Sequence, residues 1–206
     1  IFSKTTGYRH ASIEVAKPAI IKLLNDKGLA ADTTEDASGF NDQNLAKYQA
    51  VIFLNTTGDV LNETQQQSFT KFIRAGKGFV GIHAAADTEY DWPWYGGLVG
   101  AYFKSHPDQQ SARLVANPAT PNLGFTAPAK WSRKDEWYNY KSISPDIQVL
   151  FYLDEKSYRG GENGKQHPIV WYHAYDGGRA FYTGMGHTNE SYSDSPFMNL
   201  LWAGIQ

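Results

Sequence analysis

Six side chains of this sequence have the types that suit catalysis or metal binding. They are His10, His83, Asp87, His106, Glu136 and His187. Imidazole nitrogens combined with carboxylate oxygens form facial sites for divalent metal ions. Because imidazole titrates near neutral pH, the same groups also suit a general acid and base pair. The residue types by themselves leave both interpretations open.

Glu136 is distinguished by its aromatic neighbours. Trp131, Trp137 and Tyr138 flank it in the sequence. A carboxyl group buried among such rings has a raised pKa, which is the environment of an acid catalyst. The alternative is an exposed glutamate on an aromatic-rich strand.

His83 directly follows a segment that predicts a buried central strand. Residues 79–82 form a short apolar run between glycines, and three alanines after His83 predict the start of a helix. Gly81 in this run lets another part of the chain approach closely. Open α/β sheets place reactive groups at the carboxyl ends of their strands, so His83 is a candidate site residue. The alternative is a hydrogen-bonded core histidine.

Other loops at expected strand ends also carry polar or titratable groups. The residues in such loops are His10, Thr57, Asp59, His83, Asp87 and His187. In a doubly wound sheet these loops share one edge, so we expect the side chains to converge. His106 and Glu136 lie in irregular segments that would cover the resulting crevice.

The hydrophobic pattern predicts the elements that must position these groups. Helices are expected over residues 12–27, 63–75, 95–103 and 196–203. Strands are expected over residues 1–3, 29–34, 50–55, 79–82, 112–116, 148–153, 168–173 and 179–182. Asp176-Gly177-Gly178 predicts a hairpin between the last two strands. Successive strand–loop–helix units predict an α/β fold with a doubly wound, mostly parallel sheet and helices on both faces.

Composition excludes several classes of function. The 206 residues suit a single domain, 1–206, and the net charge of -2 without a basic run argues against a nucleic-acid partner. No apolar segment reaches the roughly 20 residues that span a membrane. The absence of cysteine excludes disulfides and thiolate nucleophiles. Thirty aromatic residues (six Trp, thirteen Tyr and eleven Phe) suit sugar recognition or core filling.

Motif tests exclude further classes. The sequence contains no Walker A loop, no G-x-G-x-x-G and no H-E-x-x-H, and without a G-x-S-x-G elbow a serine hydrolase is not expected. The chain begins without Met, as expected for a domain cut from a longer or processed protein.

Several blocks of the sequence resemble the ThuA-like (trehalose utilisation) family. They lie at residues 8–10, 57–59, 78–88, 91–95, 100–107, 135–138, 154–158 and 178–188. The resemblance implies a class I glutamine amidotransferase-like, flavodoxin-like core, a bacterial carbohydrate-related role and an exported (periplasmic or extracellular) location. Amidotransferases carry a catalytic cysteine in the turn that here holds His83. Since the chain has no cysteine, glutaminase chemistry is excluded.

From the residues and the resemblance we expect an enzyme, a hydrolase or lyase, that cleaves or modifies a small sugar or keto-sugar. His83 and Glu136 would be the proton-transfer pair, and Asp87 would orient His83. The expected substrate-binding residues are Tyr8, His10, Thr57, Asp59, Trp92, Tyr95, His106 and His187.

Among these substrate-binding residues, Tyr8, Trp92 and Tyr95 would stack on the sugar. A divalent metal ion held by His10, His83, His106 and His187 is one alternative. Another is a non-catalytic carbohydrate-binding or interaction domain on the same scaffold.

Overall fold

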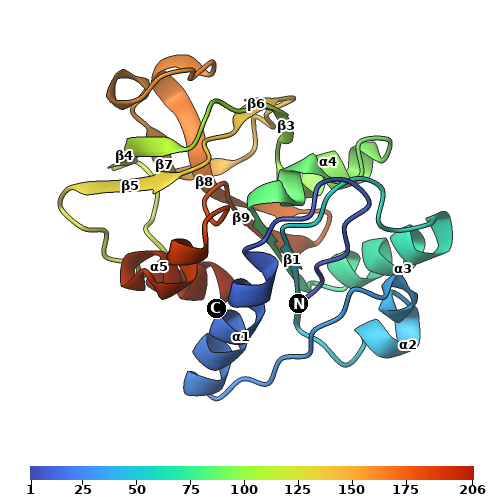
Figure 1. The fold of residues 1–206 in the computed structure, drawn as a ribbon. Helices are drawn as coiled ribbons and strands as arrows, with labels where there is room; N and C mark the ends of the chain where they lie inside the picture. The colour runs from blue at the N-terminus through green and yellow to red at the C-terminus, as the bar shows by residue number, and fades with distance from the viewer.

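A seven-stranded sheet runs through the computed structural model, which describes residues 1–206 (Figure 1). The strand order is β1-β2-β9-β8-β7-β4-β5. The strands are β1 Ala50–Leu54, β2 Gly78–Ile82, β4 Gln110–Ala116, β5 Trp131–Asp135, β7 Gln148–Leu153, β8 His167–Tyr175 and β9 Gly178–Thr183. A separate two-stranded sheet pairs β3 Tyr102–Ser105 with β6 Asn139–Lys141.

The sheet has a parallel part and an antiparallel part. β1, β2 and β9 pair in parallel, whereas β9–β8, β8–β7, β7–β4 and β4–β5 pair antiparallel. No α-helix occurs between β4 and β9, and strands joined without a crossover helix pair antiparallel. The predicted α/β class and the hairpin between β8 and β9 are confirmed, but the sheet is mixed rather than mostly parallel. The flavodoxin-like detail stays a prediction.

Helices cover both faces of the sheet. They are α1 Ile13–Asp26, α2 Asp42–Leu45, α3 Glu63–Arg74, α4 Pro93–Val99 and α5 Ser195–Ile205. α1 and α5 lie together on one side, and α3 lies with α2 and α4 on the other (Figure 1). Phe69, Phe72 and Ile73 form the buried face of α3, and Asn62 caps its first turn. No helix has the length and apolar character to cross a membrane.

Two helical segments differ from the expectation. The predicted helix over 95–103 is shorter and starts earlier, as α4. Gly100 has a φ of +90° and ends α4 with a left-handed cap, so the chain leaves the helix and continues into β3. The alanines after His83 belong to the 3-10 helix η2, His83–Asp87, rather than to an α-helix.

The first two predicted strands are reduced to isolated pairings. Phe2 forms parallel bridges with Phe53 and with Thr34. The expected strand over 1–3 therefore lies beside β1, and the one over 29–34 contributes only its last residue. Phe2 is buried in the core, where its ring packs against that of Phe53.

Candidate functional site

His83 lies in a tight turn between β2 and η2. Its φ of +48° is in the left-handed region, which is unfavourable for a residue other than glycine. Tyr182 of β9 packs on Gly81, where an added Cβ would lie 2.9 Å from the ring, so the predicted close approach is confirmed. The Tyr182 hydroxyl donates to the His83 carbonyl at 2.7 Å. A strained turn held this firmly by its surroundings is typical of functional sites.

Three side chains from distant segments meet the His83 imidazole. Glu136 Oε2 lies 3.3 Å from His83 Nε2, and His187 Nδ1 lies 3.2 Å from that same oxygen. His187 Nδ1 is also 3.3 Å from His83 Nε2. The His10 ring centroid lies 5.1 Å from that of His83 and 5.0 Å from that of His187. We call these four residues the His–Glu cluster.

The His–Glu cluster confirms the predicted convergence of strand-end loops for His10, His83 and His187, but not for Thr57 and Asp59. One donor atom from each of its four residues lies within 4.8 Å of the others. His83 and His187 follow β2 and β9, which are neighbours in the parallel part of the sheet. His10 comes from the loop after Phe2, and Glu136 from the end of β5. The chemical roles assigned to these residues stay predictions.

Burial and local contacts determine the protonation of the histidines. His83 Nδ1 lies 2.9 Å from the Gly184 carbonyl, and because a carbonyl only accepts, this nitrogen carries the hydrogen. His83 Nε2 is therefore the ring nitrogen that faces Glu136. Burial, together with the nearby His83 and His187, lowers the pKa of His10 to about 2, so this imidazole is neutral.

Glu136 has an electrostatic environment opposite to the one predicted. Burial acts to raise its pKa, but hydrogen bonds and charge interactions with His187 and His83 outweigh burial and hold the pKa well below its usual value. The prediction of a raised pKa is therefore wrong, and Glu136 is an ionised carboxylate. Trp131 does not contribute either, because it packs against Phe125 and Phe151.

Asp135 is a site residue that sequence reasoning missed. Its fully buried carboxylate accepts hydrogen bonds from the backbone N–H groups of Gly186 at 3.0 Å and His187 at 3.1 Å. It also accepts from the N–H of Glu136 at 3.0 Å, and Arg133 lies 3.3 Å away. One carboxylate thus fixes the two loops that carry Glu136 and His187. The sequence offered one signal for Asp135, which is its position directly before Glu136, a residue already selected as a candidate.

His106 lies on the outer side of Glu136. Its Nδ1 is 3.3 Å from Glu136 Oε1 and 3.0 Å from the Pro107 carbonyl, and 41% of its side chain is exposed. Because it contacts the other carboxylate oxygen, His106 is outside the set of four grouped donor atoms. The grouped donor atoms therefore come from three of the four predicted histidines and from Glu136, and metal binding itself stays a prediction.

Asp87 is close to the cluster but does not orient His83. Its carboxylate accepts from the Tyr90 hydroxyl at 2.6 Å, whereas Gly184 holds the His83 ring. Burial raises the pKa of Asp87, although the Tyr90 bond and the charges of His83 and His106 act against this rise. The raised carboxyl pKa expected at Glu136 is thus found at Asp87.

The structure separates the predicted substrate-binding residues. Tyr8 is 67% exposed, and its ring lies 4.9 Å from that of His10. Thr57 is buried and donates to the Tyr8 carbonyl at 2.9 Å, so it positions this loop rather than a ligand. Asp59 is exposed outside the cluster.

The two aromatic residues of α4 and its cap do not reach the cluster. Tyr95 is fully buried, packs against Phe53 and Phe79, and donates to a backbone carbonyl, so a stacking role is wrong. Trp92 lines a different surface hollow beside α3 and stacks on Trp94. An aromatic side chain suits both stacking on a sugar and packing in a core, and Tyr95 packs in the core.

A cavity of about 410 Å³ opens beside the His–Glu cluster. Its lining residues are Tyr8, Ala11, Ser12, Gln109, Lys134, His187, Thr188, Asn189 and Glu190. His187 belongs to both the cavity and the cluster, and its side chain is 14% exposed. The volume lies within the range of about 300–1,000 Å³ that is usual for small-molecule sites. The polar lining suits a ligand rich in hydroxyl groups.

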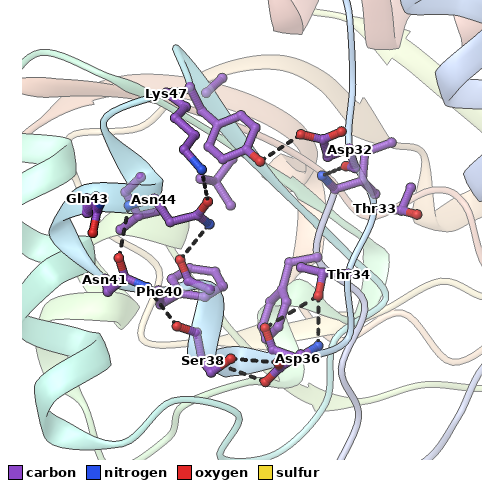
Figure 2. A pocket seen from close by; sticks show the side chains of 17 residues that line it. Asp32, Thr33, Thr34, Asp36, Ser38, Phe40, Asn41, Gln43, Asn44 and Lys47 are labelled. Carbon is purple, nitrogen blue, oxygen red and sulfur yellow. Dashed lines mark hydrogen bonds between the residues drawn. The ribbon is translucent and has the colours of Figure 1, made fainter.

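A larger hollow, of about 570 Å³, lies elsewhere, beside α2 and the start of β1. Figure 2 shows that most of its labelled polar side chains are hydrogen-bonded to neighbouring groups, with Gln43 and Thr33 as exceptions. The Tyr48 hydroxyl donates to Asp32 at 2.7 Å, and Lys47 donates to Asn44 at 3.1 Å. No histidine lines this hollow. Because most of its polar groups are already hydrogen-bonded and it lacks a histidine, we assign it no chemistry.

Comparisons with known proteins agree with the sequence blocks. A ThuA-like protein from Bacteroides uniformis matches with 25% identity and a TM-score of 0.81, over 98% of this chain and 87% of that one. A ThuA-like protein from Parabacteroides merdae matches with 22% identity and a TM-score of 0.80, over 99% of this chain and 87% of that one.

A more distant likeness shows the fold alone. The β-galactosidase from Bacillus circulans sp. alkalophilus has 12% identity and a TM-score of 0.63, over 99% of this chain and 30% of that one. A search of curated proteins gives no match. The model of the ThuA family, described as trehalose utilisation, matches residues 1–206. The chain therefore belongs to the ThuA family.

Proposed function

We propose that the chain is an enzyme that cleaves or modifies a small sugar or keto-sugar at the His–Glu cluster. Membership of a trehalose utilisation family supports a carbohydrate-related role. The observation that carries the enzymatic proposal is the cluster itself, an ionised carboxylate among three imidazoles beside a polar cavity. Such groups suit proton transfer to and from a hydroxyl or a carbon next to a carbonyl.

The geometry supports a division of roles different from the one expected from the sequence. Glu136 has a lowered pKa and is a poor proton donor. His83 is fully buried, so a substrate has little access to it. His106 is exposed and contacts Glu136 Oε1, which makes it the proton-transfer group in this proposal. The Glu136 carboxylate would stabilise the imidazolium form of His106, as a carboxylate does in catalytic triads.

The lining of the cavity favours an enzyme over a non-catalytic binding domain. A sugar-binding surface without chemistry relies on exposed aromatic faces. Tyr8 is the one Phe, Trp or Tyr side chain that lines the cavity, since Tyr95 is buried and Trp92 lies over another hollow. A binding domain also has no need for four buried or half-buried ionisable groups in mutual contact.

The test is turnover of a panel of disaccharides and their keto derivatives in D₂O, followed by NMR. We expect product formation or deuterium incorporation next to a carbonyl. His106→Gln should lower the rate by about 10²- to 10⁴-fold, the usual contribution of a general acid or base. The matched control is His173→Gln, because His173 is buried outside the cluster and should leave the rate per folded molecule unchanged.

Two results would contradict the proposal. Saturable saccharide binding without any turnover would identify the non-catalytic binding domain instead. An unchanged rate in His106→Gln would remove the assigned proton-transfer role. Circular dichroism and thermal unfolding of each variant separate loss of chemistry from loss of folding.

A further inference from the structure

We propose that the His–Glu cluster binds one divalent transition-metal ion, with Zn²⁺ as the best fit to its geometry. The ligands would be His10, His83, Glu136 and His187, whose donor atoms lie within 4.8 Å of one another. Three of the four residues are buried, and the fourth is His187 at the cavity. Three imidazoles, which are neutral when they bind a metal ion, and one carboxylate would form a donor set with a single negative charge.

The distances among three residues of the cluster match those between ligands of one ion. His83 Nε2, His187 Nδ1 and Glu136 Oε2 form a triangle with sides of 3.3, 3.2 and 3.3 Å. Zinc binds nitrogen and oxygen at about 2.0–2.1 Å in tetrahedral sites, which places two ligand atoms about 3.3 Å apart. Charge-assisted hydrogen bonds are shorter, at about 2.7–2.9 Å. The triangle is therefore closer to a metal face than to a set of strong hydrogen bonds.

His10 supplies an independent observation. The residue is only 4% exposed, and its buried Nδ1 has no hydrogen-bond partner. A buried polar atom without a partner costs free energy, and a bound ion would remove that cost. His10 lies edge-on to both His83 and His187, so it belongs to the same cluster as the triangle.

Contacts behind the ligands orient them as in metal sites. His83 donates Nδ1–H to the Gly184 carbonyl at 2.9 Å, which leaves Nε2 as the nitrogen that faces the triangle. Asp135 holds the backbone of His187 and of Glu136. Metal-binding histidines commonly donate their second ring nitrogen to such an acceptor.

The donor types indicate the class of ion. Mg²⁺ and Ca²⁺ prefer oxygen ligands, and this set has three nitrogens and one carboxylate. Imidazole-rich sites suit Zn²⁺ and neighbouring first-row ions. His187 is both a ligand and a cavity residue, so a sugar oxygen in the cavity would approach the ion. This catalytic role rests on the proposed function, whereas ion binding itself does not.

The experiment measures ion binding without any sugar. The full chain is treated with a chelator, the chelator is removed, and Zn²⁺ or Co²⁺ is titrated by calorimetry with elemental analysis of the product. We expect one ion per chain and, for Co²⁺, the visible absorption of a tetrahedral site. Glu136→Gln and His10→Gln should each weaken binding at least about 10-fold, and Zn²⁺ should raise the melting temperature of these two variants less than that of the wild type.

His173→Gln is the matched control, because His173 also has a buried Nδ1 without a partner but lies outside the cluster. It should keep wild-type ion affinity, and so should His106→Gln. Absence of stoichiometric binding would overturn the proposal, as would equal losses in His173→Gln and His10→Gln. Circular dichroism verifies that each variant is folded.

The proposed function and the metal site fail separately. Full turnover by the chelated protein would refute the catalytic ion and leave the enzyme proposal standing. Stoichiometric ion binding without turnover of any sugar would refute the enzyme proposal and leave the metal site standing.

Discussion

Asp135→Asn tests whether one buried carboxylate holds the site together. The substitution keeps the side-chain volume but replaces one oxygen by an NH₂ group. If the remaining oxygen still accepts from Glu136 and His187, the NH₂ group faces the Gly186 N–H, which was 3.0 Å from Asp135 Oδ2. Two buried donors then lack acceptors, and Arg133 loses one of its two carboxylate partners.

The structure allows the size of this effect to be worked out. Each buried polar group left without a partner costs about 1–3 kcal/mol, and breaking a buried ion pair costs about 3–5 kcal/mol. Because Arg133 keeps Asp194 at 2.9 Å, its charge stays paired and the ion-pair cost is largely avoided, so the two unpaired donors dominate at about 2–6 kcal/mol together. We expect the free energy of unfolding to fall by about 3–4 kcal/mol, which lowers the melting temperature by about 10 °C for a chain of this length.

The assay is urea unfolding and thermal unfolding, with Asp194→Asn as the control. Asp194 is one-third exposed and pairs with the same arginine, so its substitution should cost only about 1 kcal/mol. Asp135→Asn should also weaken the proposed ion binding about 10- to 100-fold, since it releases the loop of His187. Equal effects of the two substitutions, or a cost below about 1 kcal/mol for Asp135→Asn, would refute this reasoning.

Two further predictions concern the turn at His83 and the acid stability of the chain. Tyr182→Phe removes the hydroxyl that donates to the His83 carbonyl at 2.7 Å, so it should cost about 1–3 kcal/mol in urea unfolding; no measurable cost would show that the turn is held by other contacts. Hydrogen bonds from Arg9 and Lys17 lower the pKa of Glu35 from 4.5 to about 2, so its stabilising contribution is complete above about pH 4.5 and is lost as the pH falls through about 2. Because the Glu35 side chain is 40% exposed, Glu35→Gln should cost less than about 1 kcal/mol at pH 7 and weaken the acid dependence of stability, and an unchanged acid profile would contradict the assignment.

The elements that could be predicted from the sequence are those with strong local signals. β1, β2 and α3 follow from uninterrupted apolar runs, an amphipathic pattern and the Asn62 cap. The β8–β9 hairpin follows from its glycine-containing turn. The meeting of His83 and His187 was also predictable, because both follow parallel strands and such strands end at one edge of the sheet.

The antiparallel part of the sheet was harder to predict. The segments of β4, β7 and β8 were predicted as strands and that of β5 was not, and the order and direction of all four depend on pairing between distant residues, such as Leu114 with Leu153. Gly100 likewise ended α4 through a left-handed conformation that the helical pattern alone did not reveal.

The sequence and the tertiary structure each determined part of the chemistry of the site. The sequence determined which groups were available: histidines and acids at strand ends, and no cysteine. Only the tertiary structure decided their states. Burial alone predicted a raised pKa for Glu136, but proximity to His83 and His187 reversed the sign, and packing made Tyr95 a core residue while Asp135 became the anchor of two loops. A pKa and a hydrogen bond depend on distances of a few ångströms between segments far apart in the chain, and local sequence patterns do not specify such distances.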